Sequence, residues 1–151
     1  MVQLVLPNDA NTMGNVLGGM VLHWIDLAAA VVAHRHCRNE AVTASIDQVS
    51  FLAPIKVGQL AMIAARMTGT GKTSMEIRVD VQSEDLLSGE RRQTLTAYLT
   101  FVAVDGKGRP RPVPPLIPET EDERREARNA ERRRVARLSQ RDTPQGEREL
   151  R

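Results

Sequence analysis

Residues 18–37 read GGMVLHWIDLAAAVVAHRHC, and this stretch decides the fold. It contains no proline, it has three alanines in a row at its centre, and apolar side chains cover most of its circumference when it is wound as a helix. A helix that is apolar nearly all round is normally buried. Basic side chains gather at its end, where they suit the negative pole of the helix dipole. We therefore predict a long, buried, central helix from about Gly18 to about Cys37.

The residues after this helix change to a period of two, which is typical of strands that bury one face. In residues 73–83, TSMEIRVDVQS, the odd positions from Met75 to Val81 are apolar and the even positions are polar. Further β-favouring runs cover residues 2–6, 42–52, 59–68 and 93–104. The order predicts an α+β fold, in which a curved antiparallel sheet wraps around the helix and the last four strands follow one another as hairpins. A long edge strand needs protection, so we expect two chains to join edges into one sheet.

The chain of 151 residues has the length of one domain with a tail. We assign residues 1–118 to the domain, 119–141 to a charged C-terminal helix and 142–151 to a disordered tail. The C-terminal helix has acidic side chains first and arginines later, but few apolar positions, which indicates a solvated helix. Residues 109–118 contain five of the eight prolines and are expected to be extended.

The composition excludes several classes of protein. With 41% apolar and 26% charged residues, the chain is not fully disordered. Cys37 is the only cysteine, which excludes an intrachain disulfide and a zinc site built from several cysteines. Basic residues exceed acidic residues by only one both in 1–118 and in 119–151, which gives no support for a nucleic-acid partner. The start of the chain lacks the pattern of a signal peptide and no apolar run could span a membrane, so a cytoplasmic protein is expected.

Asp26 is unusual because it lies between Ile25 and Leu27 in the most apolar helix of the chain. A buried carboxylate is costly unless it is paired, hydrogen-bonded or protonated, so Asp26 is either functional or on an exposed or capping position. Helical spacing puts it on one stripe with His23 and His34. Those two histidines are about 16 Å apart along the helix, which excludes one metal ion bound by both.

Glycines at the start of a helix let another group approach the backbone closely. Gly18 and Gly19 hold this position, where free amide N–H groups and a partial positive charge form a site for an oxyanion or a polarised carbonyl. Asn11 and Asn15, in the preceding loop, can orient water. Each of these features also fits an ordinary turn before a helix.

Residues 69–74, GTGKTS, resemble a phosphate loop only superficially. The spacing of a Walker A motif fails, because one residue separates the glycines and no helix follows. A hairpin turn that offers N–H groups, hydroxyls and one lysine can still hold a phosphate, and a plain hairpin turn is the alternative.

Four ordered stretches resemble one family. PNDANTMGNVLGGMVLHWIDLAAAVVAHRHC is similar to the helix-entry signature of the cytosolic acyl-CoA thioesterases of the hotdog fold, and VTASIDQVSFLAPIKVGQ, GKTSMEIRVDVQSE and GRPRPVPPLIPETEDE are similar to later parts of it. The similarity covers about residues 7–140. It is greatest to the long-chain acyl-CoA hydrolases whose animal members carry two hotdog domains in one chain, whereas this chain has one.

The resemblance implies a hotdog fold and hydrolysis of a fatty acyl-CoA to a free acid and CoA, without a metal or organic cofactor. It matches Asp26 to the catalytic carboxylate, which acts as general base or nucleophile, and Asn11 to the catalytic asparagine. It also matches Gly19 to the glycine whose N–H polarises the thioester carbonyl. Two subunits are expected to form a double-hotdog dimer, with each site pairing Asn11 of one chain and Asp26 of the other. Three such dimers are expected to form a hexamer. Candidates for contact with CoA are Gly18, Gly71, Lys72, Thr73, Ser74, Arg91 and Arg92.

Two other functions use the same fold. A hotdog hydratase or dehydratase uses a histidine and a carboxylate as acid and base, and His23 with Asp26 could imitate that pair. A regulator on this fold binds acyl-CoA without turning it over. Only hydrolysis of the thioester releases a free thiol. Thiol release therefore distinguishes a thioesterase from a hydratase and from a regulator.

Overall fold

The computed structural model describes residues 1–142 and confirms an α+β fold. In chain order the elements are β1 (Val2–Leu4), the short 3-10 helix η1 (Pro7–Asp9), α1 (Gly18–Cys37), β2 (Glu40–Asp47), β3 (Leu60–Thr70), β4 (Ser74–Glu84), β5 (Arg91–Val104) and α2 (Glu121–Arg141). The bounds of α1 agree with the predicted central helix. The expected disorder of the tail falls outside the described residues, apart from Asp142, which follows α2 directly.

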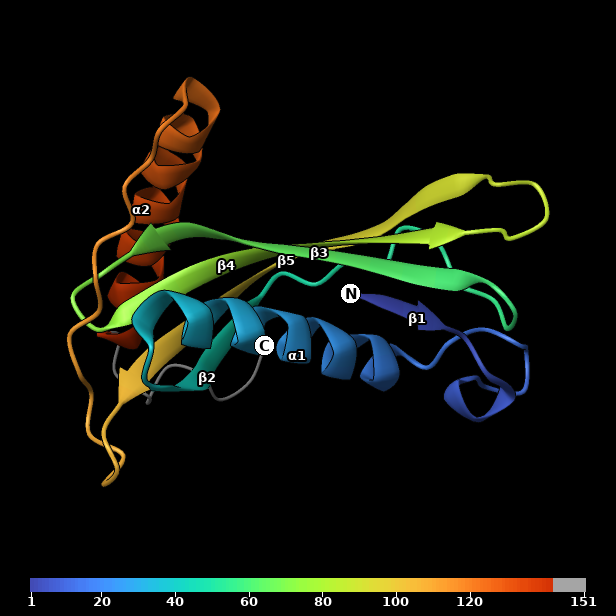
Figure 1. The fold of residues 1–151 in the computed structure, drawn as a ribbon, viewed down its shortest axis with the longest axis horizontal. Coiled ribbons are helices and arrows are strands. Elements are labelled where there is room, and N and C mark those ends of the chain that lie inside the picture. Colours follow the sequence, from blue (N-terminus) through green and yellow to red (C-terminus); the bar gives the residue numbers. More distant parts are fainter. Residues whose placement is uncertain (143–151) are drawn as a thin grey trace.

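The five strands form one antiparallel sheet in the order β1-β3-β4-β5-β2 (Figure 1). Strands β3, β4 and β5 are joined as hairpins, as predicted, but β2 pairs with β5 at the far edge. The expectation of four successive hairpins is therefore wrong for β2. This strand also ends at Asp47 and not at residue 52, because Gln48 has a left-handed backbone with φ of 45° that breaks the extended path. Residues 48–59 then connect β2, at one edge of the sheet, to β3, which lies next to the opposite edge strand β1.

The core lies between α1 and the inner face of the sheet. Ile25, Ala29 and Ala33 of α1 are fully buried, and Trp24 is 4% exposed. The predicted alternation of β4 is confirmed, because its four apolar odd positions face this core with no exposed surface. Alanines along the buried side of α1 bring the helix close to the sheet, so a mainly aliphatic core is enough to hold the two together.

One side of α1 is open in the single chain. Leu27 and Val31 of α1 are 45% and 56% exposed, and Val42 and Ile46 of the edge strand β2 are 50% and 38% exposed. The helix is thus buried on fewer sides than its sequence predicts. The open side of α1 and the unpaired edge of β2 are features that monomeric proteins rarely expose.

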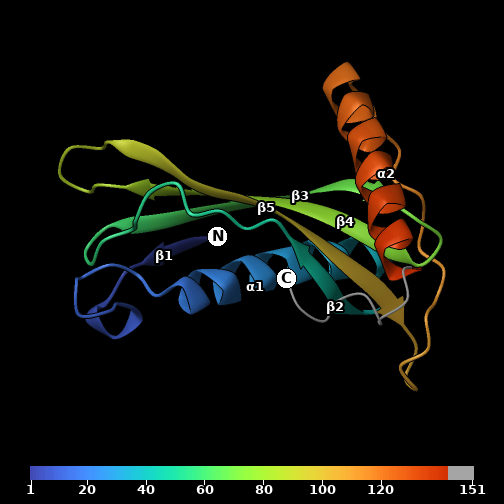
Figure 2. The same ribbon diagram turned by 180° about the vertical axis from the view of Figure 1, so that it is seen from behind.

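The charged helix α2 packs on the outer face of the sheet, opposite α1 (Figure 1, Figure 2). Ala130 is 4% exposed and lies against Gly69 of β3, where an added Cβ would come within 2.8 Å of the Ala130 Cβ. Glu76 of β4 is 5% exposed and accepts hydrogen bonds from Thr68 and Arg133. The expectation of a fully solvated helix is therefore wrong for one face. The sequence of α2 has no apolar stripe that would predict this contact, because the contact is made by ion pairs and one small side chain.

The guanidinium group of Arg133 also lies over the ring of Tyr98, 3.8 Å from its centroid. Arg78 of β4 donates to Asp80 at 3.0 Å and to Glu126 of α2 at 2.8 Å, and these partners raise its pKa further above its ordinary value. Alternating charges thus join the sheet to α2. No helix within residues 1–142 is long and apolar enough to cross a membrane.

Candidate active site

Asp26 lies on the open side of α1, beside β2, and is partly buried. The hydroxyl of Thr43 donates a hydrogen bond of 2.7 Å to its Oδ1 atom, which leaves Oδ2 as the second acceptor. Sequence reasoning did not identify Thr43, since a threonine in a strand is too common to be a signal. The stripe of histidines does not converge on Asp26: His23 is exposed, and His34 bonds the Ala30 carbonyl instead.

The start of α1 presents two free amide groups. Leu17 is the N-cap residue, and its side chain cannot accept a hydrogen bond from the first turn. The amides of Met20 and Val21 reach the Leu17 carbonyl at 3.0 and 3.3 Å, but those of Gly18 and Gly19 have no acceptor within residues 1–142. Gly19 is exposed, and apart from its chain neighbours and the backbone of its own helix, no described atom lies within 4 Å of a Cβ built on it. The N-terminus of this 20-residue helix, which is the positive end of its dipole, is therefore accessible to a ligand.

Asn11 lies in the loop that is tied to this helix start. Its Oδ1 atom accepts hydrogen bonds from the amides of Met13 and Asn15, at 3.0 and 3.1 Å. Its Nδ2 group has no partner in the described part of the chain. The loop is anchored because the amide of Leu17 donates to the Asp9 carbonyl at 2.9 Å. The turn thus fixes the carboxamide of Asn11 and leaves its two N–H donors available.

An apolar hollow of about 380 Å³ adjoins the start of α1. Val16, Val21 and residues 51–55 line most of it, and Gly18 and Thr94 complete it. The ring of Phe51 lies over Gly18, with its Cζ atom 3.6 Å from where a Cβ would be. Thr94 is 1% exposed, and its hydroxyl has no hydrogen-bond partner within residues 1–142. The hollow can hold an apolar group next to the two amides.

One chain does not bring Asp26 to these amides. Asp26 follows Gly19 by seven residues, so it lies on nearly the same side of α1 but about 10 Å further along. Gly18 and Gly19 thus lie at the helix start, Asn11 lies in the loop tied to it, and Asp26 and Thr43 form a separate group at mid-helix. A thioester bound at the first group needs a carboxylate from elsewhere.

The residues predicted to contact CoA also divide into two groups. Gly71, Lys72 and Thr73 form the β3–β4 turn, and Ser74 begins β4. Arg91 and Arg92 begin β5, opposite Glu84 and Ser83 at the other end of β4. The length of β4 separates the two groups by about 30 Å. They cannot contact the same phosphate of a ligand bound to one chain.

No group of three or more His, Cys, Asp or Glu side chains in residues 1–142 is arranged to hold a metal ion.

Comparison with known families and proteins gives consistent matches. The model of the thioesterase superfamily matches residues 13–90. A Bacillus subtilis protein named as an uncharacterized acyl-CoA thioester hydrolase is 45% identical over 119 residues, which are 79% of this chain and 69% of that protein. The mouse cytosolic acyl coenzyme A thioester hydrolase is 40% identical over 83% of this chain, but the chain spans only 33% of that longer protein.

Solved structures agree. A hexameric acyl-CoA thioesterase superposes with a TM-score of 0.89 at 43% identity, over 95% of this chain and 92% of the other. An acyl-CoA hydrolase of Staphylococcus aureus, solved with butyryl-CoA and CoA, gives a TM-score of 0.82 at 35% identity, over 95% and 90% of the two chains. Three further structures of the Staphylococcus aureus enzyme each carry one alanine substitution: of an asparagine, of an aspartate 15 residues later, and of a threonine 17 residues after that.

Proposed function

The chain belongs to the thioesterase superfamily and, within it, to the acyl-CoA thioester hydrolases, and from this premise we propose that it hydrolyses fatty acyl-CoA to a free acid and CoA. One observation carries the proposal to the residues. Asn11, Asp26 and Thr43 have the same spacings, 15 and 17 residues, as the three residues substituted in the Staphylococcus aureus hydrolase. The hydrogen bond between Thr43 and Asp26 supports a shared role for that pair.

The thioester carbonyl binds at the start of α1. The Gly19 amide donates to the carbonyl oxygen and stabilises the oxyanion that develops on it, by about 3–4 kcal/mol if it acts like other oxyanion donors. The Nδ2 group of Asn11 orients the attacking water or the substrate. The apolar hollow beside Gly18 excludes water from part of the bound ligand, which strengthens these polar contacts.

Asp26 supplies the base or the nucleophile. As a base, its Oδ2 atom takes a proton from water while the water oxygen attacks the carbonyl carbon, and the proton passes to the departing CoA sulfur. As a nucleophile, Oδ2 attacks the carbonyl carbon, CoA leaves, and water cleaves the resulting anhydride. In both cases Thr43 holds Oδ1 and fixes which oxygen faces the reacting carbon.

The site is completed by a second chain. The distance of about 10 Å between Gly19 and Asp26 along α1 supports a site in which each chain gives its helix start to one thioester and its Asp26 to the other. The exposed apolar side of α1 and the free edge of β2 suit such a double-hotdog dimer. We extend the proposal to a trimer of dimers, since two structural relatives are described as hexameric. A cytoplasmic location follows the name of the mouse relative.

Thiol release from a panel of acyl-CoAs, from short to long chain, tests the function. We expect release by the wild type, and at least roughly a hundredfold slower turnover by Asp26→Ala, which should fold and assemble normally. Near-normal turnover by this variant would remove Asp26 from the mechanism. Binding of acyl-CoA without thiol release by the wild type would indicate a regulator. Conversion of an enoyl-CoA, included in the panel, to a hydroxyacyl-CoA with its thioester intact would indicate a hydratase.

A further inference from the structure

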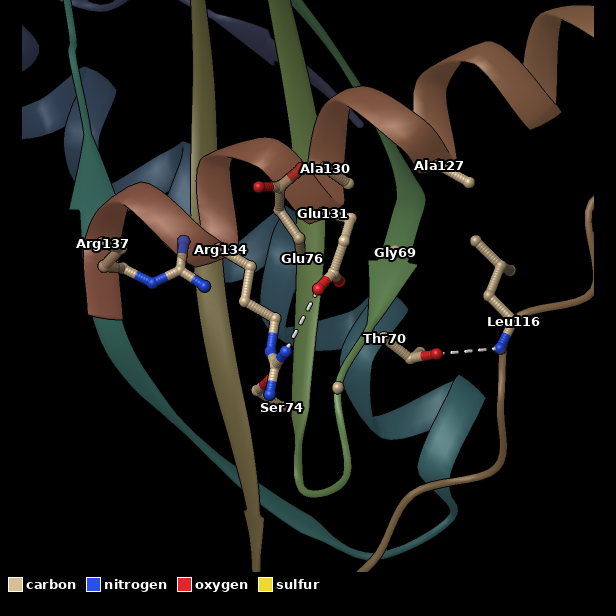
Figure 3. Close-up of a pocket in the computed structure, with 11 residues that line it drawn as sticks. Gly69, Thr70, Ser74, Glu76, Leu116, Ala127, Ala130, Glu131, Arg134 and Arg137 are labelled. Atoms are coloured by element: carbon tan, nitrogen blue, oxygen red, sulfur yellow. Dashed lines mark hydrogen bonds and ion pairs between the residues drawn. The ribbon is translucent and has the colours of Figure 1, made fainter. Parts of the chain in front are cut away.

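A second pocket lies on the outer face of the sheet, between the β3–β4 turn and the C-terminal half of α2. It has a volume of about 170 Å³. Four cationic side chains line it, and none of its lining residues is acidic: the cations are Lys72, Arg134, Arg137 and Arg141. Figure 3 shows the adjoining hollow, in which Arg134 extends from α2 toward Ser74 and Arg137 lies over the sheet.

The positive charge of this pocket is only partly neutralised. Arg134 and Arg137 each have one carboxylate at 3.4 Å, which belong to Glu131 and Asp47. Lys72 and Arg141 have no ion pair among residues 1–142. Charges of one sign in a small pocket raise the local concentration of an oppositely charged ligand.

A buried hydroxyl also faces this pocket. Thr100 of β5 is 4% exposed, lines the pocket and has no hydrogen-bond partner for its Oγ1 atom in the described chain. The Oγ atom of Ser45, which lies directly opposite Thr100 in the β2–β5 pairing but does not line the pocket, is also buried without a partner within residues 1–142. Buried hydroxyls are nearly always hydrogen-bonded, so the Thr100 hydroxyl at a cationic pocket favours a ligand that brings its own acceptor oxygens.

The turn is shaped to accept a guanidinium group. A Cβ on Gly71 would lie 2.5 Å from the Ser74 Oγ atom and 2.8 Å from the Arg134 Nε atom. Only the absence of a side chain at this position lets Arg134 lie against the backbone of the turn. The turn and α2 therefore form one site that neither makes alone.

We propose that this pocket binds a phosphate group, with Lys72, Arg137 and Arg141 as its charged contacts and the Thr100 hydroxyl as a donor. Planar guanidinium groups match the oxygens of a phosphate, and charge-assisted hydrogen bonds of this kind are strong. The phosphate comes either from the nucleotide end of acyl-CoA, which rests on the proposed function, or from a free nucleotide. Ala44 of β2 lines the pocket, and its neighbour Thr43 bonds to Asp26. The pocket therefore lies beside the part of β2 that contacts Asp26.

The test removes together the two charges that have no ion pair within residues 1–142, in Lys72→Gln/Arg141→Gln. The matched control is Lys107→Gln/Arg132→Gln, which removes two surface charges that do not line the pocket. The binding of CoA, dephospho-CoA and ADP to the assembled protein is measured by calorimetry at low salt. We expect at least one probe to bind at least about tenfold more weakly to the pocket variant and within about twofold of wild type to the control.

Kinetics separate the two sources of phosphate. If the substrate supplies it, the ratio of kcat/KM for acyl-CoA to kcat/KM for the matching acyl-pantetheine falls in the pocket variant. If a free nucleotide supplies it, that ratio stays at the wild-type value while ADP binding weakens. Unchanged binding of all three probes overturns the proposal. Because binding is read without turnover, this result is distinct from a failure of the proposed hydrolysis.

Thr100→Val provides an independent check on the hydroxyl. It keeps the shape of the side chain and removes a group that has no partner in residues 1–142, so the fold is expected to persist. We expect weaker binding of the same probe that responds to the charge variant. Unchanged affinity for that probe would remove Thr100 from the site.

Discussion

At the scale of single residues, the hydrogen bond from Thr43 to Asp26 is the contact most open to test. Thr43→Val removes the hydroxyl and keeps the shape, so we expect kcat to fall by about tenfold with KM little changed, because Asp26 loses the bond that orients it. Thr43→Ser retains the hydroxyl and should retain most of the activity. Thiol release measures both variants.

A structural role for Thr43 predicts a different result. If Thr43 only supports β2, then Thr43→Val should be as stable and as active as the wild type, because valine favours strands. Thr43→Ser should then be the less stable variant. Equal turnover by the two variants would show that the hydroxyl does not act on Asp26.

The sequence exposes some parts of the candidate site better than others. Asp26 is visible because a carboxylate in an apolar helix is rare, and Gly18 and Gly19 because paired glycines at a helix start are unusual. Thr43 cannot be identified from the sequence. Its contact with Asp26 depends on how β2 packs against α1, and no local sequence pattern predicts that packing. The position of the α2 arginines on the sheet could not be predicted either, because a charged helix has the same composition whether it is exposed or packed against a sheet.

At the scale of elements, the contact between α2 and β3 depends on one glycine. In Gly69→Ala the new Cβ would meet the Ala130 Cβ at 2.8 Å, so the helix or the strand must shift. We expect a loss of about 1–3 kcal/mol in the free energy of unfolding, as for other overpacked contacts. Urea unfolding measures the loss.

The second substitution Ala130→Gly serves as the control. By itself it costs about 1 kcal/mol, because glycine is unfavourable within a helix. Combined with Gly69→Ala it removes the clash, so the double variant should be more stable than the sum of the two losses predicts. Strictly additive losses would mean that the contact at Gly69 is loose enough to absorb a methyl group.

The start of α2 is expected to respond to acid. The amides of Glu119 and Thr120 donate to the Glu123 carboxylate, and these bonds lower the pKa of Glu123 below its ordinary value of 4.5. A lowered pKa means that the charged form stabilises the fold above the ordinary value, and that this stability is lost as the pH falls through the lowered one. We expect the first turn of α2 to fray in that range.

Amide protection of the first turn, followed by NMR, measures this local effect. Asp85 and Asp105 also have lowered pKa values through backbone hydrogen bonds, so global unfolding would not isolate Glu123. Glu123→Gln keeps acceptor oxygen but does not titrate, so the pH dependence of that turn should disappear. Persistent dependence in this variant would assign it to another group.

Among the elements, the positions of β2 and α2 were the hardest to predict. Alternation in residues 73–83 identifies β4 because both of its faces have a clear character. Five exposed residues in β2 make its pattern irregular, and its pairing with β5 joins segments about 60 residues apart in sequence. Pairing at an edge is decided by the whole sheet and not by the strand itself.

At the scale of the whole molecule, the proposed two-chain site predicts that inactive subunits rescue each other. In a dimer of one Asn11→Ala chain and one Asp26→Ala chain, one site carries both substitutions and the other carries neither. Random mixing at equal amounts should therefore restore about a quarter of wild-type turnover. Co-refolding the two variants and measuring thiol release tests this arrangement.

Each variant refolded alone is the control for that mixture. If the mixture is no more active than the two variants, Asn11 and Asp26 act within one chain and the dimer proposal is wrong. Sedimentation of the mixture shows whether the chains have assembled, so a failure to associate is not mistaken for a site within one chain.

The two faces of the sheet carry one optical label each. Trp24, the only tryptophan, is buried between α1 and the sheet, and Tyr98, the only tyrosine, lies beneath Arg133 of α2. Fluorescence excited at the red edge follows the inner face alone, whereas ultraviolet difference absorbance of the phenol ring follows the outer one. Dissociation of α2 from the sheet, by salt for example, would thus change the tyrosine signal while tryptophan emission stays constant. The two faces of the sheet can therefore be monitored separately without an added label.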